Sequence, residues 1–183
     1  MTLPRRAFVA IRHGETDANR AGLIAGRTEA MLTEAGRAAA ARLAQWSWPA
    51  DLALFASPQR RARDTAALAF PRRSARILPG LRERDWGCHE GAPVSTLPPR
   101  HACPEGGEPY EEMLARVTAA TCLALESAGG RLPVLVAHSG VIRILRLLSG
   151  GSDGGPSAPN ATPILFTPAA TGWHERVLDK TMR

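Results

Sequence analysis

Cysteine, lysine and aromatic residues are all scarce in this sequence of 183 residues. The thiols of Cys88, Cys103 and Cys122 are odd in number and show no Cys-x-x-Cys spacing. The odd number argues against a disulfide framework, and the lack of a Cys-x-x-Cys spacing argues against a zinc site. We therefore expect three free cysteines and no bound metal.

Long apolar runs are absent as well. No segment approaches the roughly 18 apolar residues that a membrane-spanning helix requires. The basic N-terminus, Met1–Arg6, is not followed by an apolar stretch of signal-peptide length. The sequence therefore predicts a cytoplasmic protein with no membrane partner.

Basic residues outnumber acidic ones by 23 to 17, which gives a net charge of +6. Nearly all of them are arginine, since Lys180 is the one lysine, and they are dispersed along the chain. Aromatic residues make up 5% and do not interleave with a basic stripe. This pattern argues against nucleic-acid binding, whereas a basic surface favours small anionic substrates.

The remaining composition is that of an ordinary globular protein, with 44% hydrophobic and 22% charged residues. A chain of this length can bury a proper core without disulfides or metal. There is no internal repeat and no convincing linker. We expect one domain, residues 1–183.

Strand-like apolar runs alternate with helix-like segments. The predicted strands are Ala7–Ile11, Leu52–Ala56, Arg76–Leu78, Leu132–Ala137, Pro163–Thr167 and Trp173–Leu178. The predicted helices are Thr33–Trp46, Ser57–Phe70, Glu108–Ser127 and Ser139–Gly150, with Thr33 and Ser57 as caps and Pro58 in the first turn. Leu81–Pro99 should be irregular and Gly150–Asn160 a mobile loop. Such alternation indicates an α/β layered fold with a mostly parallel central sheet.

Two histidines directly follow predicted strands. His13 comes after "AFVAI" and His138 after "LPVLVA". Open parallel sheets place their sites beyond the carboxyl ends of their strands, so both rings should meet at one sheet edge. A neutral imidazole can act as a nucleophile, and arginine forks match phosphate oxygens bidentately. Histidines and arginines together therefore indicate phosphoryl transfer.

Six segments, in order along the chain, resemble the histidine phosphatase superfamily, the phosphoglycerate mutase-like or RHG-motif proteins. They are "RHGETDAN" (Arg12–Asn19), "AGRTEAMLTEAG" (Ala25–Gly36), "SPQRRARDTA" (Ser57–Ala66), "LRERDWGCHEG" (Leu81–Gly91), "PEGGEPYEEMLARV" (Pro104–Val117) and "LVAHSGVIR" (Leu135–Arg143). The resemblance implies a three-layer α/β/α sandwich of the phosphoglycerate mutase type.

The resemblance also implies a role for each central residue. His13 would attack phosphorus and become a transient phosphohistidine. Arg12 and Arg61 would clamp the phosphoryl oxygens, and His138, protonated in that anionic setting, would add a further donor and charge. Glu83 would protonate the departing oxygen and then activate water.

Other residues of these motifs would assist. Asn19 would donate to the same oxygens, and Ser139 could itself bind phosphate. Glu15 and Thr16 would orient the loop and the second ring nitrogen of the nucleophile, and Gly14 would allow the backbone to approach the phosphate closely.

The sequence departs from the family pattern at a few positions. Ala18 and His89 stand where an aromatic residue is frequent, and Ser139 stands where glycine is common. None of these departures touches the central roles. His101 and His174 match no motif, and we interpret them as surface or structural residues.

Several functions remain open at this stage. A phosphomonoesterase is favoured over a phosphoglycerate mutase-type transferase, because the interval between Glu83 and His138 is short for a lid that shields the intermediate from water. A catalytically silent phosphate-binding or scaffold module is a third possibility. No cofactor is expected, and a monomer or a homodimer is equally compatible.

The substrate should be a small phosphate ester, with α-ribazole 5'-phosphate of cobalamin biosynthesis as one candidate. A sugar phosphate or a phosphohistidine protein is also compatible. Specificity should reside in Gly87–His101 and in the Gly150–Asn160 loop.

Overall fold

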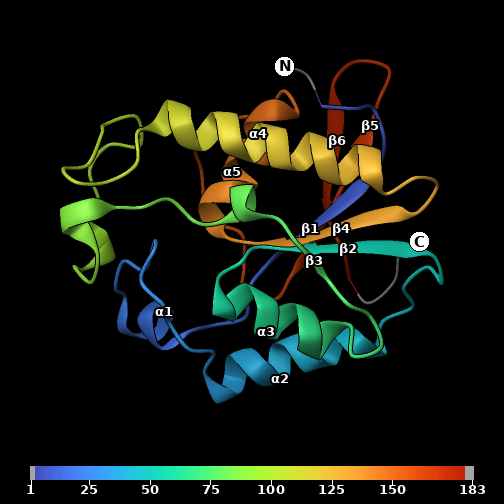
Figure 1. Ribbon diagram of the computed structural model, residues 1–183, viewed down its shortest axis with the longest axis horizontal. Helices are drawn as coiled ribbons and strands as arrows, with labels where there is room; N and C mark the ends of the chain where they lie inside the picture. Colours follow the sequence, from blue (N-terminus) through green and yellow to red (C-terminus); the bar gives the residue numbers. More distant parts are fainter. Residues whose placement is uncertain (1–2, 180–183) are drawn as a thin grey trace.

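Within residues 3–179, which the structure describes, six strands form one sheet in the order β3-β2-β4-β1-β5-β6. The structure is a computed structural model (Figure 1). The strands are β1 (Phe8–Arg12), β2 (Leu52–Ala56), β3 (Arg76–Ile77), β4 (Leu132–Ala137), β5 (Pro163–Pro168) and β6 (Trp173–Val177). The helices are α1 (Asp17–Ala21), α2 (Glu34–Arg42), α3 (Arg60–Ala69), α4 (Tyr110–Ser127) and α5 (Ser139–Leu148).

The first four strands along the chain run parallel. β4 pairs with both β1 and β2, and β2 also pairs with β3, all in parallel. β5 runs antiparallel to β1, and β6 runs antiparallel to β5 at the sheet edge. The predicted mostly parallel sheet is therefore confirmed.

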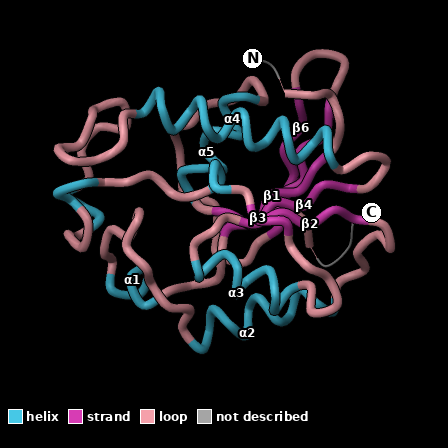
Figure 2. Tube along the Cα trace, in the orientation of Figure 1, coloured by secondary structure: helices cyan, strands magenta, loops and turns pink. Residues whose placement is uncertain are grey.

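Helices cover both faces of the sheet. α4 and α5 lie on one face and α2 and α3 on the other (Figures 1 and 2). Side chains alternate along β1 between two hydrophobic clusters: Phe8 and Ala10 pack towards α4 and α5, whereas Val9 and Ile11 pack towards α2 and α3. The central strands are thus buried on both faces, as parallel strands between helices must be.

Helix starts are partly as the sequence predicts. The Thr33 side chain accepts the Gly36 N–H and caps α2, as expected. The prediction that Ser57 caps α3 with Pro58 in its first turn is wrong, because α3 begins at Arg60 after Gln59. The Ser57 hydroxyl has another partner, described below.

Short helical pieces were missed by periodicity. α1 is five residues long and begins with a capping box, a reciprocal pair of hydrogen bonds between Thr16 and Asn19. A helix this short shows no clear periodicity in the sequence. Leu43–Gln45 continues α2 as a 3-10 turn, and Leu81–Pro99 contains two more such turns within otherwise irregular chain. No helix within residues 3–179 combines the length and apolar character needed to cross a membrane.

The Gly150–Asn160 segment is irregular, as predicted, but it is held by side chains of the fold. Arg143 on α5 donates to the carbonyl oxygens of residues 153, 154 and 155. The Tyr110 hydroxyl binds the Asp153 carboxylate at 2.6 Å. Charged and polar groups therefore anchor this loop against α4 and α5.

Candidate active site

The two predicted histidines meet at the carboxyl edge of the sheet. Arg12 pairs with Ala137 where β1 and β4 end, and the His13 N–H donates to the Ala137 carbonyl at 3.0 Å. The ring centroids of His13 and His138 lie 5.2 Å apart. The shared strand polarity thus brings both rings to one place, as the sequence predicts.

The His13 ring is fixed by the next residue. Its Nδ1 lies 2.8 Å from the Gly14 carbonyl oxygen, so the proton of the neutral ring sits on Nδ1 and Nε2 keeps a free lone pair. Burial, then Arg61 and Arg12, lower the pKa of His13 to about 3, against a smaller opposing effect of the Gly14 bond. His13 is therefore neutral at physiological pH, as a nucleophile must be.

The loop after His13 packs tightly against α2 and α3. A Cβ on Gly14 would lie 2.5 Å from the Gly36 carbonyl oxygen, and the Gly14 N–H donates to Thr65 Oγ1 at 2.9 Å. The Glu15 carboxylate accepts the Thr33 hydroxyl at 2.7 Å. Glu15 therefore orients the loop as predicted, but the second ring nitrogen of His13 is held by the Gly14 carbonyl, not by Glu15.

His138 is completely buried, and Ser57 holds it. His138 Nε2 lies 2.7 Å from Ser57 Oγ. The Gln59 N–H donates to the same hydroxyl at 3.3 Å, so Ser57 connects the buried ring to the residue before α3. Burial, followed by the charge of Arg61, lowers the pKa of His138 well below its usual value. Burial therefore disfavours the charged form of His138 in the protein without a ligand, and the protonated form expected beside a bound anion stays a prediction.

Arg61 is buried and points inward from α3. Its guanidinium donates to the carbonyl oxygens of Thr28 at 2.8 Å, Gly26 at 2.7 Å and Ala25 at 3.0 Å. Burial lowers its pKa, whereas the charge of Glu83 raises it. No carboxylate within residues 3–179 forms a direct ion pair with it, so its hydrogen bonds go to uncharged carbonyl oxygens.

Arg12 lies at the end of β1, beside the 150–160 loop. Its Nη1 donates to the Ala158 carbonyl at 2.8 Å, while its buried Nε has no protein partner within the described part of the chain. Burial lowers the pKa of Arg12 and the charge of Glu83 raises it. Arg12, Arg61 and Glu83 are therefore within electrostatic reach of one another.

Glu83 is oriented by backbone donors. Its carboxylate accepts the Gly140 N–H at 3.0 Å and the Arg84 N–H at 2.9 Å. The Glu83 N–H in turn donates to the Gln59 side-chain oxygen at 2.7 Å. A Cβ at Gly140 would lie 2.2 Å from the Glu83 carboxylate, so the first turn of α5 has room for this carboxylate only because residue 140 is glycine.

Asn19 and Ser139 complete the predicted set. The Asn19 side-chain oxygen accepts the Thr16 N–H at 3.2 Å. Ser139 Oγ and His138 Nδ1 are buried and have no hydrogen-bond partner within residues 3–179. Buried polar atoms are nearly always paired, so these atoms, with the Nε of Arg12, indicate a polar ligand.

A cleft of about 280 Å³ opens in front of Arg12 and Glu83. Its other lining residues are Trp86, Val94, Leu97, Pro98, Arg100, Ser139, Gly140, Arg143 and Ser157. The wall is thus apolar on the side of residues 86–98 and basic at two arginines. The region expected to set specificity, Gly87–His101, supplies much of this wall.

Sequence reasoning missed three supporting side chains: Ser57, Gln59 and Thr65. All lie in the "SPQRRARDTA" segment, where local signals indicated only a helix start and an arginine. Gln59 reaches from there to Gly26, whose carbonyl oxygen accepts its amide at 2.6 Å. Their partners are remote in sequence, so no local pattern could have shown them.

His101 and His174, interpreted as surface or structural residues, are both exposed. The His101 ring contacts the Tyr110 ring edge-on, and its Nε2 lies 3.7 Å from the Asp153 carboxylate; His174 lies on β6. Cys88 and Cys103 are exposed free thiols. Among residues 3–179 no three His, Cys, Asp or Glu side chains gather in a way that could hold a metal ion.

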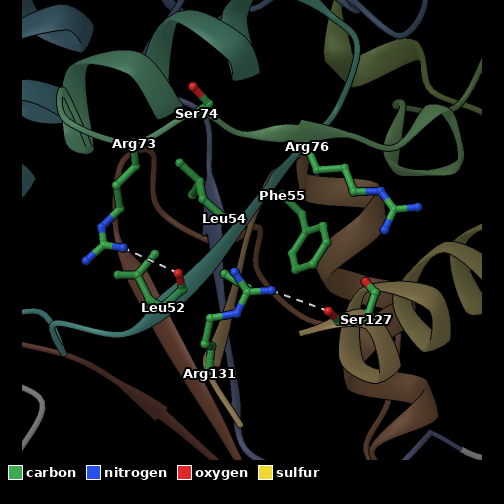
Figure 3. A pocket seen from close by; sticks show the side chains of 9 residues that line it. Leu52, Leu54, Phe55, Arg73, Ser74, Arg76, Ser127 and Arg131 are labelled. Carbon is green, nitrogen blue, oxygen red and sulfur yellow. Dashed lines mark hydrogen bonds between the residues drawn. The ribbon is translucent and has the colours of Figure 1, made fainter. Parts of the chain in front are cut away.

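A second cavity, of about 340 Å³, lies along β2 towards its amino end (Figure 3). Its lining residues are Leu52, Ala53, Leu54, Phe55, Arg73, Ser74, Arg76, Ser127 and Arg131. Arg73 donates to the Leu52 carbonyl and Arg131 to the Ser127 carbonyl. These arginines satisfy backbone groups at element ends, and the cavity contains none of the predicted site residues.

The fold and the site together define a class of protein: an α/β/α sandwich with two buried histidines beside two arginines at the carboxyl edge of its sheet. This chain belongs to the histidine phosphatase superfamily: the family model for branch 1 matches residues 8–157. The resemblance given by the six sequence segments is thereby confirmed.

Individual relatives agree with this assignment. An adenosylcobalamin/alpha-ribazole phosphatase of Salmonella typhimurium is 31% identical, with 91% of this chain and 83% of that protein covered. A metal-independent phosphoserine phosphatase of Arabidopsis thaliana is 30% identical over 76% of this chain and 67% of that protein. A phosphoglycerate mutase structure from Thermus thermophilus superimposes with a TM-score of 0.73 at 32% identity, covering 95% of this chain and 97% of that one. The predicted phosphoglycerate mutase-like fold is confirmed.

Proposed function

We propose that this protein is a metal-independent phosphomonoesterase that passes the phosphoryl group of a small ester through His13. One observation carries the proposal: the proton of the buried His13 ring is held on Nδ1 by Gly14, which leaves Nε2 unprotonated beside His138 and two arginines. A neutral nucleophile in a cationic pocket is what attack on a phosphate dianion requires.

In the first step His13 Nε2 attacks phosphorus, the N–P bond forms and the ester P–O bond breaks. Arg12, through its free Nε, and Arg61 neutralise the phosphoryl oxygens, since guanidinium groups match them in charge and geometry. Glu83, in its protonated form, gives its proton to the departing alkoxide. Its carboxylate lies at the cleft wall, where the leaving group would be.

In the second step water attacks the phosphohistidine. The Glu83 carboxylate takes a proton from that water, the N–P bond breaks, and inorganic phosphate leaves with Nε2 of His13 free again. His138 Nδ1–H, Ser139 Oγ and Asn19 would bind the phosphoryl oxygens throughout. The negative charge of the bound group would favour the protonated form of His138.

The cleft supports an ester whose alcohol carries a ring. Its apolar wall, Trp86, Val94 and Leu97, suits a planar or apolar body next to the phosphate. We propose α-ribazole 5'-phosphate as the first substrate to test, since a relative covered over most of its length is named for that reaction. Phosphoserine is the second, because another relative is named for it.

The test is a panel of phosphate monoesters, assayed with EDTA, on wild type and His13→Ala. We expect hydrolysis that resists the chelator and is lost in His13→Ala but kept in His174→Ala, a matched change of an exposed histidine. A rapid quench into alkaline detergent, with the ester labelled on phosphorus, should trap the label on His13, because phosphohistidine survives alkali but not acid. A parallel acid quench, which preserves an acyl phosphate, tests for label on a carboxylate. Label on a carboxylate would refute the nucleophile assignment, and loss of activity in EDTA would refute metal independence.

The same panel separates the alternatives. Isomerisation of 3-phosphoglycerate faster than phosphate release would establish the mutase-type transferase. Phosphate binding without turnover of any ester would establish the silent binding module. Sedimentation of the active protein would decide between the monomer and the homodimer.

A further inference from the structure

The turn before β5 lies against the catalytic end of β1. β5 pairs antiparallel with β1, with Pro163 opposite Ile11, so residues 160 and 161 lie beside Arg12 and His13. The Ala161 N–H donates to the Arg12 carbonyl at 2.9 Å. The turn at the end of the 150–160 loop therefore binds the backbone of the proposed nucleophile.

This turn is held in an unusual backbone conformation. Ala161 has a φ of +48°, and within residues 3–179 it is the one residue other than glycine with a positive φ. A side chain disfavours this region, and such strain persists where the surroundings impose it. Here the strained residue directs its own N–H and the neighbouring Asn160 side chain at the end of β1.

Asn160 uses both protons of its side-chain amide. Its Nδ2 donates to the His13 carbonyl at 2.8 Å and to the Asn19 side-chain oxygen at 3.1 Å. The amide therefore forms a fork that connects the backbone of the nucleophile with a proposed phosphate donor. These two acceptors lie 147 and 141 residues away in the sequence.

The second arm of the fork and the Thr16 N–H together fix how the Asn19 amide is turned. The Asn19 oxygen accepts two N–H groups, from Thr16 and from Asn160. Rotating the amide by half a turn would place its own NH₂ against both donors and leave them unpaired. The nitrogen end of Asn19 is thus kept free to donate elsewhere.

We propose that Asn160 is a positioning residue for phosphoryl binding: its amide fork holds Asn19 as a donor to the phosphoryl oxygens and fixes the backbone of His13. The proposal rests on the proposed function, since it needs a phosphoryl group in the site. Asn160 itself acts through Asn19 and His13 and does not touch the substrate.

The test is a double-mutant cycle on Asn19 and Asn160, read out as the affinity for inorganic phosphate by calorimetry and as KM and kcat. We expect Asn19→Ala and Asn160→Ala each to weaken phosphate binding about tenfold or more, as the loss of a hydrogen bond to a charged group does. The double variant should bind phosphate as tightly as whichever single variant binds it less tightly, because both changes remove the same donor. Effects that multiply would overturn the proposal.

Two further variants separate positioning from folding. Asn160→Asp keeps the shape but puts an oxygen against both acceptors, so it should weaken phosphate binding more than Asn160→Ala. Thr162→Val removes only the hydroxyl bond to the Asn160 carbonyl, 3.1 Å long, and should bind phosphate like wild type. If Asn160→Ala does not fold, the cycle is run with Asn160→Ser, whose hydroxyl cannot reach both acceptors.

The outcomes for the two proposals are distinct. Wild type that binds no phosphate and cleaves no ester would refute the proposed function. Wild type that does both, with Asn160→Asp equal to it in phosphate affinity and KM, would refute the role of Asn160 alone.

Discussion

Lowering the pH from about 7 to about 4.5 should destabilise the protein through His13. The side chain has a pKa of about 6.5 in an unfolded chain and about 3 in the folded protein, because burial and two arginines disfavour its charge. Between these values the unfolded state holds a proton that the folded state lacks, so the free energy of unfolding falls as the pH falls. The slope is about 1.4 kcal/mol per pH unit, or about 2.5 kcal/mol over this range.

Urea unfolding of wild type and His13→Gln at each pH, in phosphate-free buffer, measures this effect. Taking the difference between the two proteins removes the contributions of the carboxylates and of His138, which both share. Wild type should lose about 2.5 kcal/mol relative to the variant between these pH values. A difference that stays constant with pH would show that His13 takes up its proton normally in the folded protein, and the argument for a neutral buried ring would be refuted.

Two further predictions concern glycines. Gly36→Ala should destabilise the protein by about 1–3 kcal/mol in urea unfolding, because its Cβ would lie 2.1 Å from the Glu15 carbonyl, whereas Gly130→Ala, with open space around it, should be nearly neutral; equal midpoints would contradict this. Gly140→Ala should leave the melting temperature unchanged but displace the Glu83 carboxylate. Its kcat should therefore fall more for an alkyl phosphate than for p-nitrophenyl phosphate, whose leaving group needs no proton; an equal fall for both would argue against Glu83 as the acid.

Much of the site could be predicted from the sequence because its parts are local. "RHG" and "AHS" each follow a buried strand, and the polarity of parallel strands brings their histidines together without further information. The clustering of Arg61 and Glu83 with them came from the resemblance of whole segments. Their roles in catalysis stay predictions.

The rest depends on contacts between distant segments. Ser57 looks like a helix cap in its own segment, and only the position of β4 shows that it holds His138. The charge state of His138 depends on complete burial, which no local pattern reports. Asn160 belongs to a Gly- and Pro-rich stretch whose composition predicts a mobile loop, while its actual contacts are with residues near the other end of the chain.

The way Arg61 is anchored also bears on how this protein can diverge. The oxygens that hold it belong to the main chain at positions 25, 26 and 28, and every amino acid carries such an oxygen. Substitutions at positions 25 and 28 can therefore accumulate without releasing the cation, whereas an aspartate anchor would have to be retained and would cancel the charge. Position 26 is the exception, because a Cβ there would lie 2.0 Å from the Arg84 carbonyl. Within this segment we expect variation among descendants at the flanking positions and glycine between them.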